Sequence, residues 1–329
     1  HWALLAIRPY CFLCLYQLYR PILLSLAITI LITIIAVHGL NILTGYCGQV
    51  SIAQAAFMGV GAYTCAILCS YCGFSFWAAL PCAAIASGLV GILFGLPSFR
   101  LKEFYLLMAT IAAQFIIIWL IVQLRSWTGG TDGMIVSSPE LGGVVIKDKH
   151  QWFFLSLASA ALMTFFAYNL MRSKIGRAFI AIRDNDLAAQ VMGISVWKYK
   201  LLAFFIGSTF AGAAGALWAA YFRGIHPDHF GVWASVWMLG MLIVGGMGST
   251  MGVIYGTILI KGLEEFVTVI APWLAATFPF IAAQVAASVG LALNGLVIAL
   301  FLILEPRGIN HRWVMAKSWY RLWPFSYWR

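Results

Sequence analysis

Long runs without a charged residue dominate the pattern of hydrophobic and polar positions along this chain. The runs are residues 21–99, 104–124, 152–171, 201–222 and 266–304. A membrane-spanning helix needs about 20 apolar residues, so these runs and the region 229–262 have room for roughly eight to ten crossings. The pattern predicts an all-α polytopic integral membrane protein.

Composition and charge agree with this fold class. Of the 329 residues 63% are hydrophobic and only 9% are charged, outside the usage of soluble globular domains. The formal net charge is +10, with six Lys/Arg in 172–200 and five in 306–329, whereas basic and acidic residues balance in 125–151. Because Lys and Arg favour cytoplasmic loops, we expect 172–200 and the C-terminus inside and the loops 125–151 and 223–233 outside. The charge therefore predicts topology and no binding to nucleic acid.

These features divide the chain into three parts. Residues 1–20 are expected to form an N-terminal interfacial segment, and residues 21–305 the membrane-spanning domain. Residues 306–329 alternate aromatic and basic side chains, which is typical of a segment at the cytoplasmic membrane surface. Membrane lipids are therefore expected partners of this tail.

The stretch 41–72 is apolar but contains several glycines and amides that a simple membrane helix does not need. Counting crossings places residue 41 outside and residue 100 inside, so that 42–72 would re-enter the membrane or cross it twice. Non-helical backbone at membrane depth is tolerated only where protein or water covers it. The stretch thus predicts a broken helix that faces a cavity.

A second glycine-interrupted stretch, 239–256, repeats the spacing of the first. Such corresponding breaks indicate an internally repeated transporter with its pathway at the repeat interface. For two further amides, Gln114 and Asn294, hydrogen bonding between helices is an equal alternative. The candidate pathway residues are Gly45, Gly48, Gln49, Ser51, Gln54, Gln114, Gly245, Gly248 and Asn294.

The sequence shows no energy source of its own. We expect charged residues only at the ends of the spans, whereas an ion-coupled carrier needs an intramembrane acid or base. No GxxxxGK[ST] phosphate loop occurs. Energy supplied by a partner through the segment 172–200 is the preferred interpretation. An ion-coupled secondary transporter of small metabolites is the alternative.

Enzymatic and metal sites are not predicted. The CxxC pairs Cys11/Cys14 and Cys69/Cys72 lie in or beside apolar segments. Pro227 disrupts the spacing of His226 and His229. No constellation of catalytic side chains at one depth is recognisable, so we expect neither a resident metal nor an enzyme.

Four stretches in order carry a resemblance to a known family: GLNILTGYCGQVSIAQAAFMGVGAY (39–63), FRLKEFYLLMATIAAQFI with WTGGTDGM (99–134), GRAFIAIRDNDLAAQVMGISVWKYKLLAFFIGSTFAGAAGAL (176–217), and PDHFG with MLIVGGMGSTMG (227–252). With them the chain resembles the LivM-type permease subunits of branched-chain amino-acid ABC importers. The resemblance implies a sister permease subunit, two cytoplasmic ABC ATPase subunits that bind ATP and Mg²⁺, and a periplasmic substrate-binding protein. It also implies a place in the bacterial inner membrane.

In such importers a cytoplasmic loop of the EAAxxxG type docks onto the ATPase. Here the loop reads AAxxxG, with Leu187 where the family has Glu. Phe179, Ile182 and Leu187 are expected to present the apolar docking surface, and charged neighbours to set its register. The predicted ATPase-coupling residues are Gly176, Arg177, Arg183, Asp184, Asp186, Ala188, Ala189 and Gly193.

The resemblance leaves the substrate open. Ala53 stands where the family often has Gly, and Trp237 where many members have an acid. Branched-chain amino acids, or related small polar or acidic solutes, are the expected cargo, and the binding protein is expected to do most of the selecting. In the outer loop, Asp132 is a hypothetical contact of that binding protein.

Overall fold

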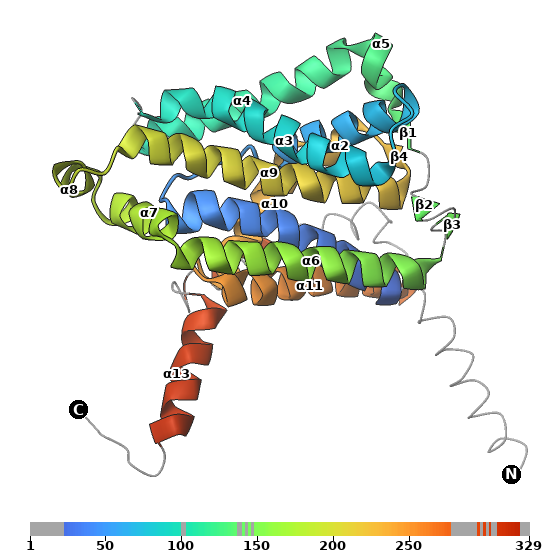
Figure 1. The fold of residues 1–329 in the computed structure, drawn as a ribbon. Coiled ribbons are helices and arrows are strands. Elements are labelled where there is room, and N and C mark those ends of the chain that lie inside the picture. The colour runs from blue at the N-terminus through green and yellow to red at the C-terminus, as the bar shows by residue number, and fades with distance from the viewer. Residues whose placement is uncertain are drawn as a thin grey trace, which may run out of the picture.

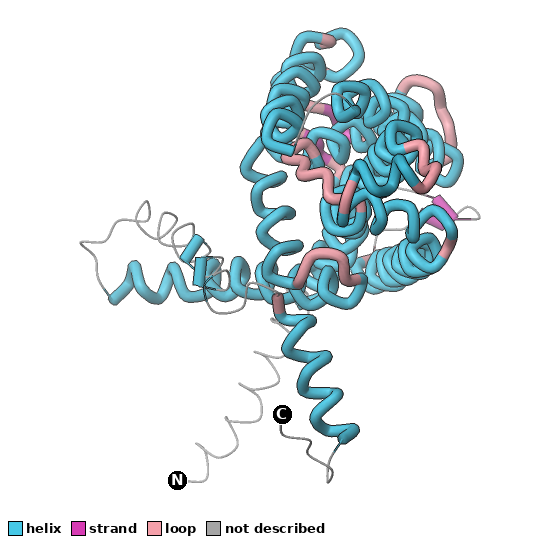
Figure 2. The backbone as a smooth tube through the Cα atoms, turned by 90° about the vertical axis from the view of Figure 1, so that its left-hand side faces the viewer, coloured by secondary structure: helices cyan, strands magenta, loops and turns pink. Residues whose placement is uncertain are grey.

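The computed structural model describes residues 23–99, 103–136, 140–141, 144–145, 148–277, 295–296, 299–300, 303 and 308–322. Nearly all of this backbone is helical, and the short strands lie between helices (Figure 2). Six described helices are long and apolar enough to cross a membrane: Leu23–Tyr46, Phe76–Gly95, Phe104–Gln123, Lys149–Arg172, Val196–Phe222 and Pro227–Gly245. The predicted all-α polytopic membrane fold is confirmed. The number of crossings stays a prediction.

The elements follow the chain in a simple order. After the first span, Leu23–Tyr46, they are α2 (Gln54–Ser70), α3 (Phe76–Gly95), η2 (Leu96–Phe99), α4 (Glu103–Gln123), α5 (Arg125–Thr128), η3 (Gly130–Asp132), β1 (Met134–Ile135), β2 (Glu140–Leu141), β3 (Val144–Val145), α6 (Lys149–Arg172), α7 (Lys174–Asp184), α8 (Asp186–Val191), α9 (Val196–Phe222), β4 (Gly224–Ile225), η4 (Pro227–Phe230), α10 (Val232–Gly245), α11 (Thr250–Thr277) and α13 (Ile309–Leu322).

The bundle has two chemically different ends (Figure 1). We call the end with α7 and α8 the basic end, because it holds the segment 172–200. The opposite end holds α5 and the strands, of which β1 pairs antiparallel with β4 and β2 with β3. The two loops predicted to share a side, 125–151 and 223–233, meet there in their described residues through the pairing of β1 with β4. The tail helix α13 leaves from the basic end (Figure 1).

Helix α9 runs through the middle of the bundle and packs on α2 and α3 through small residues. A methyl group at Gly61 would collide with the backbone of Gly212, and one at Gly215 with the carbonyl of Met58. Since apolar burial does not hold helices together in lipid, close approach through small residues provides the contact instead. The glycine content of this region is thereby explained by packing.

The predicted break after the first span is confirmed, but its position is not as predicted. The span ends in a π-helical turn, η1 (Asn41–Tyr46), and regular helix resumes only at Gln54. The turn lies at the basic end, next to Arg183 of α7, whereas counting crossings had placed residue 41 and the segment 172–200 on opposite sides. The span starts at the opposite end, where Ser25 accepts a hydrogen bond from Lys149. Residues 42–72 therefore return across the bundle once, as the single helix α2.

Candidate functional site

At the basic end the two glycine-containing breaks lie side by side, although about 200 residues separate them in sequence. Asn41 connects them. Its buried side-chain amide accepts a hydrogen bond from the backbone N–H of Gly248 (2.9 Å) and donates one to the carbonyl of Ser249 (3.3 Å). The hydroxyls of Tyr46 and Thr250 lie 3.2 Å apart. Gly45 of the first stretch and Gly248 of the second are thus brought together.

Arg183, the penultimate residue of α7, is the third part of this contact. Its guanidinium donates to the carbonyl of Gly45 at 3.0 Å. A methyl group at Gly48 would lie 2.9 Å from the Arg183 Cγ, and one at Gly248 would lie 3.0 Å from its Nη1. Both glycines also have left-handed backbone, with φ of +74° and +76°, which favours glycine. We call Asn41, Gly45, Gly48, Arg183 and Gly248 the junction.

The remaining predicted glycine, Gly245, has a different role. A methyl group there would collide with the backbone of Gly252 and would lie 3.2 Å from the amide nitrogen of Gly256. Gly245 therefore allows α10 and α11 to pack closely and does not contact Arg183. Asn41 was missed by sequence reasoning. The available signal was a single amide near the end of an otherwise apolar span.

The segment 172–200 forms two short helices joined at Asn185. The Asn185 side chain accepts hydrogen bonds from the amides of Leu187 and Ala188 and so caps α8. After α8 the chain turns at Gly193, whose φ is +83°. Asp186, in the first turn of α8, pairs with Lys200 at 2.5 Å. These contacts fix α8 as an exposed, capped helix at the end of the molecule.

The apolar surface of this segment differs from the prediction. Phe179 and Ile182 are buried, and the Phe179 ring packs edge-on against Tyr199. By contrast, Leu187 and Val191 of α8 and Met192, which directly follows it, are 73%, 87% and 80% exposed. Periodicity correctly indicated an apolar face on α7, but the bundle itself covers that face.

The other predicted coupling residues fall into two groups. Gly176 and Ala189 are buried, and a methyl group at Gly176 would collide with Met171. The exposed members are Arg177, Arg183, Asp184, Ala188 and Gly193. Asp184 accepts from its neighbour Arg183 at 3.3 Å.

A cavity of about 770 Å³ opens beside α8. Its lining includes Asp186, Gln190, Gly193, Trp197 and Lys200, and it reaches Leu96 at the end of α3. The groove mixes an ion pair with an aromatic side chain. Such a surface suits a protein partner better than a small apolar ligand.

The side chain of Gln114 hydrogen-bonds to the start of α2 rather than lining an open pathway. Its side-chain oxygen accepts from the amide of Ala56 and from the hydroxyl of Ser235, both at 3.1 Å, and its nitrogen donates to the carbonyl of Phe230 at 2.6 Å. Ser235 in turn accepts from Ala55. The first amides of a helix have no partners within the helix, so these side chains satisfy a helix start inside the bundle. Of the two interpretations of Gln114, hydrogen bonding between helices is therefore the one that its contacts support.

The amides in the break itself are less well satisfied. Gln54 donates to the carbonyls of Ala36 and Gly207, but its side-chain oxygen has no hydrogen-bond partner within the described residues. Neither polar atom of the buried Gln49 side chain has such a partner there. Ser51 accepts from the amide of Ala53 at 3.3 Å. Because a buried polar group without a partner is costly, Gln49 is the strongest of the predicted pathway amides.

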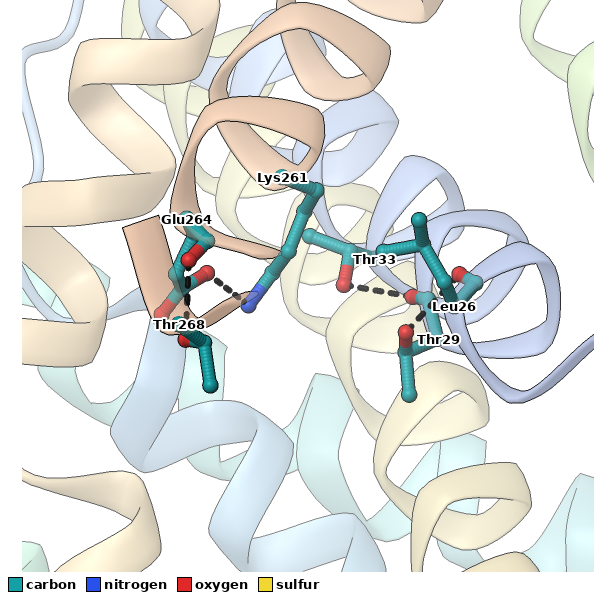
Figure 3. Close-up of polar contacts among 6 residues, drawn as sticks. All are labelled: Leu26, Thr29, Thr33, Lys261, Glu264 and Thr268. Atoms are coloured by element: carbon teal, nitrogen blue, oxygen red, sulfur yellow. Dashed lines mark hydrogen bonds and ion pairs between the residues drawn. The ribbon is translucent and has the colours of Figure 1, made fainter. Parts of the chain in front are cut away.

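Charged residues lie within α11, a helix that is not among the six described helices long and apolar enough to cross a membrane. The expectation that charges occur only at the ends of spans therefore stays a prediction. The continuous helix α11 has 28 residues and carries Lys261, Glu264 and Glu265 near its middle. Lys261 and Glu264 pair at 2.7 Å, one helical turn apart. Figure 3 shows Lys261 between Glu264 on its own helix and Thr33 of the first span. The pair neutralises the two charges and allows the helix to continue.

Two predicted residues lie away from the junction. Asp132 is at the opposite end, 74% exposed and paired with Arg125 at 3.1 Å. Asn294 lies outside the described residues.

The family model "Branched-chain amino acid transport system / permease component" matches residues 22–305. The high-affinity branched-chain amino acid transport system permease proteins LivM of Salmonella typhimurium (strain LT2) and Escherichia coli (strain K12) are each 32% identical over 265 residues, 73% of this chain and 62% of each relative. The chain thus matches less than two thirds of the length of these relatives.

More distant matches follow. The probable branched-chain amino acid transport permease protein LivM of Methanocaldococcus jannaschii is 29% identical over 180 residues, 54% of this chain and 51% of the relative. The solved structure of PsaBC from Streptococcus pneumoniae in complex with Fab has a TM-score of 0.43 and 14% identity, covering 89% of this chain and 94% of that chain. On the match across residues 22–305, this chain belongs to the family of permease components of branched-chain amino acid transport systems.

Proposed function

We propose that this chain is the transmembrane permease subunit of a high-affinity ABC importer for branched-chain amino acids or related small polar or acidic solutes. It would act in the bacterial inner membrane, with 172–200 and the C-terminus in the cytoplasm. Its partners would be a sister permease, two ABC ATPases and a periplasmic binding protein. ATP and Mg²⁺ would bind the ATPases, and the chain itself would carry no cofactor and no enzymatic activity.

The contact of Arg183 with both glycine breaks is the observation that supports this function most. Arg183 ends the helix that precedes α8, and it donates to the carbonyl of Gly45 at 3.0 Å. A partner that displaces α8 would pull on α7 and hence on Arg183. The contacts of Asn41 with Gly248 and Ser249 would then break, and the pathway would open at the basic end.

The docking element in this mechanism is α8. Leu187, Val191 and Met192 expose apolar side chains at the tip of the molecule, and the groove beside them carries the Asp186–Lys200 pair. An apolar centre with a charged rim is the usual composition of a protein interface. The ATPase subunit is the proposed occupant.

Copurification and transport together test this function. The chain would be isolated from its native membranes in mild detergent, and the complex reconstituted in liposomes with its binding protein. We expect two P-loop ATPases and a second permease to copurify, and leucine uptake to depend on ATP. Isolation of the chain alone, with uptake that follows an ion gradient, would contradict the proposal and favour a secondary transporter.

A further inference from the structure

A second cavity, of about 630 Å³, lies at the opposite end of the bundle. The first span, α6, the end of α9 and α11 all contribute to it. Its polar lining consists of Ser25, Thr29, Lys149, Arg223 and Glu265. The cavity therefore brings two cationic side chains and one carboxylate together from three separate elements.

The position of Arg223 is unusual for its residue type. It follows the last residue of α9 with φ of 60°, and it is the one residue other than glycine with positive φ in the part of the chain that the structure describes. Glycine is the common residue at this place after a helix. The backbone of Arg223 is fixed on both sides, since its amide donates to the carbonyl of Ala219 (2.9 Å) and its carbonyl accepts from the amide of Val136 (2.8 Å). Backbone held in a sparsely populated region is typical of functional sites.

The other charges are also held at the wall. Lys149 donates to the hydroxyl of Ser25 at 3.0 Å. Glu265 directly follows Glu264, but only Glu265 lines the cavity, whereas Glu264 pairs with Lys261. Lys149 is exposed and Arg223 and Glu265 are half-buried, so a polar solute in the cavity can reach all three charges.

The rest of the wall is apolar. It is formed by Leu26, Trp152, Tyr221 and Phe222, and the rings of Trp152 and Tyr221 pack edge-on at 5.5 Å. Few convergent polar groups on an apolar surface are typical of a small-molecule site. Here these groups include both signs of charge.

We infer that this cavity receives an α-amino acid zwitterion with an apolar side chain. The carboxylate would lie toward Arg223 and Lys149, the ammonium toward Glu265, and the side chain against the aromatic wall. The direction of travel rests on the proposed function, whereas the chemistry of the cargo rests on the cavity.

Thiol labelling tests the inference without the binding protein, which would otherwise dominate the measured affinity. The purified permease complex would carry Thr29→Cys, a near-isosteric change in the cavity wall. The rate of maleimide labelling of the introduced thiol would be measured with and without millimolar L-leucine. The exposed native Cys72 and Cys82 are the internal reference. Ser25→Cys provides a second reporter on the same wall.

We expect leucine to slow labelling at position 29 several-fold, glycine to slow it much less, and neither to affect the reference thiols. Adding Glu265→Gln should remove the protection, whereas the matched Glu264→Gln should keep it. Absence of protection at both reporters, equal protection by glycine, or protection that survives Glu265→Gln would overturn the inference. ATP-driven uptake by the unmodified complex separates the two proposals. Uptake without protection refutes the cavity alone, and protection without uptake refutes the proposed function alone.

Discussion

Polar side chains at the basic end connect backbone segments to one another, whereas those at the opposite end surround a cavity. Asn41 and Arg183 bind carbonyls and amides of the two glycine breaks, while Arg223 and Glu265 line open space. Contacts between backbone segments can break and re-form without a ligand. A lining that carries both signs of charge can bind a solute that also carries both. The basic end is therefore suited to closing, and the opposite end to receiving a solute.

The largest effect is expected at Gly48. Both Gly48 and Gly73 have positive φ, but Gly73 has no neighbour where a side chain would start, whereas Gly48 faces Arg183. Gly48→Ala should lower the free energy of unfolding by roughly 2–5 kcal/mol, from backbone strain plus overpacking. Gly73→Ala should lower it by roughly 1–2 kcal/mol from strain alone. Unfolding by SDS titration in mixed micelles measures both. Equal losses would show that the junction is not tightly packed.

Asn41→Leu should come next. It leaves the Gly248 amide and the Ser249 carbonyl without their partner, at a cost of about 1–3 kcal/mol. Because the lost contacts hold the junction closed, the buried Cys47, 2% exposed, should become reactive toward maleimide. Gln114→Leu is the matched control: it should lower stability and leave Cys47 protected. If Cys47 labels equally fast in both variants, the junction is not a specific closure.

Arg183→Gln tests whether the basic end couples ATP hydrolysis by the partner to opening of the junction. It removes a charge-assisted hydrogen bond to Gly45, so leucine uptake per ATP hydrolysed should fall about tenfold. Arg172→Gln, whose guanidinium lies over the ring of Tyr168, is the control. Uptake and ATP hydrolysis would be measured together in proteoliposomes. An unchanged ratio in Arg183→Gln would contradict the proposed coupling.

The smallest structural effect is expected at Asp132, in the exposed pair with Arg125. Asp132→Lys should change the free energy of unfolding by less than about 0.5 kcal/mol. If the residue contacts a binding protein, uptake driven by that protein should still fall. Unchanged uptake and unchanged docking would remove Asp132 from the interface.

Sequence patterns could predict the breaks but not every part of the junction. Gly45 and Gly48 were recognisable because glycines and amides in an apolar run indicate backbone that leaves the helix, and Gly248 because the spacing repeats. No repeated spacing of this kind marks Asn41. Its role depends on Gly248, which is 207 residues away, and only the fold brings the two together.

Other errors share one physical origin. A periodic pattern indicates that a helix has an apolar face, but not which surface covers it, so Phe179 and Ile182 were assigned to a partner although the bundle buries them. Likewise, the region 229–262 and the run 266–304 were treated as separate, whereas α11 continues through 261–265. The Lys261–Glu264 pair makes that position compatible with a continuous helix.

The single arginine shared by Gly48 and Gly248 also constrains how this chain can evolve. A side chain at Gly48 would meet the Cγ of Arg183, and one at Gly248 would meet its guanidinium, so a change at one position alters what the other tolerates. A smaller residue at 183 would remove these two contacts but also the bond to Gly45. The residues at positions 48, 183 and 248 should therefore change together among relatives. A substitution at one of these positions that a relative tolerates should fail when it is introduced alone into another relative.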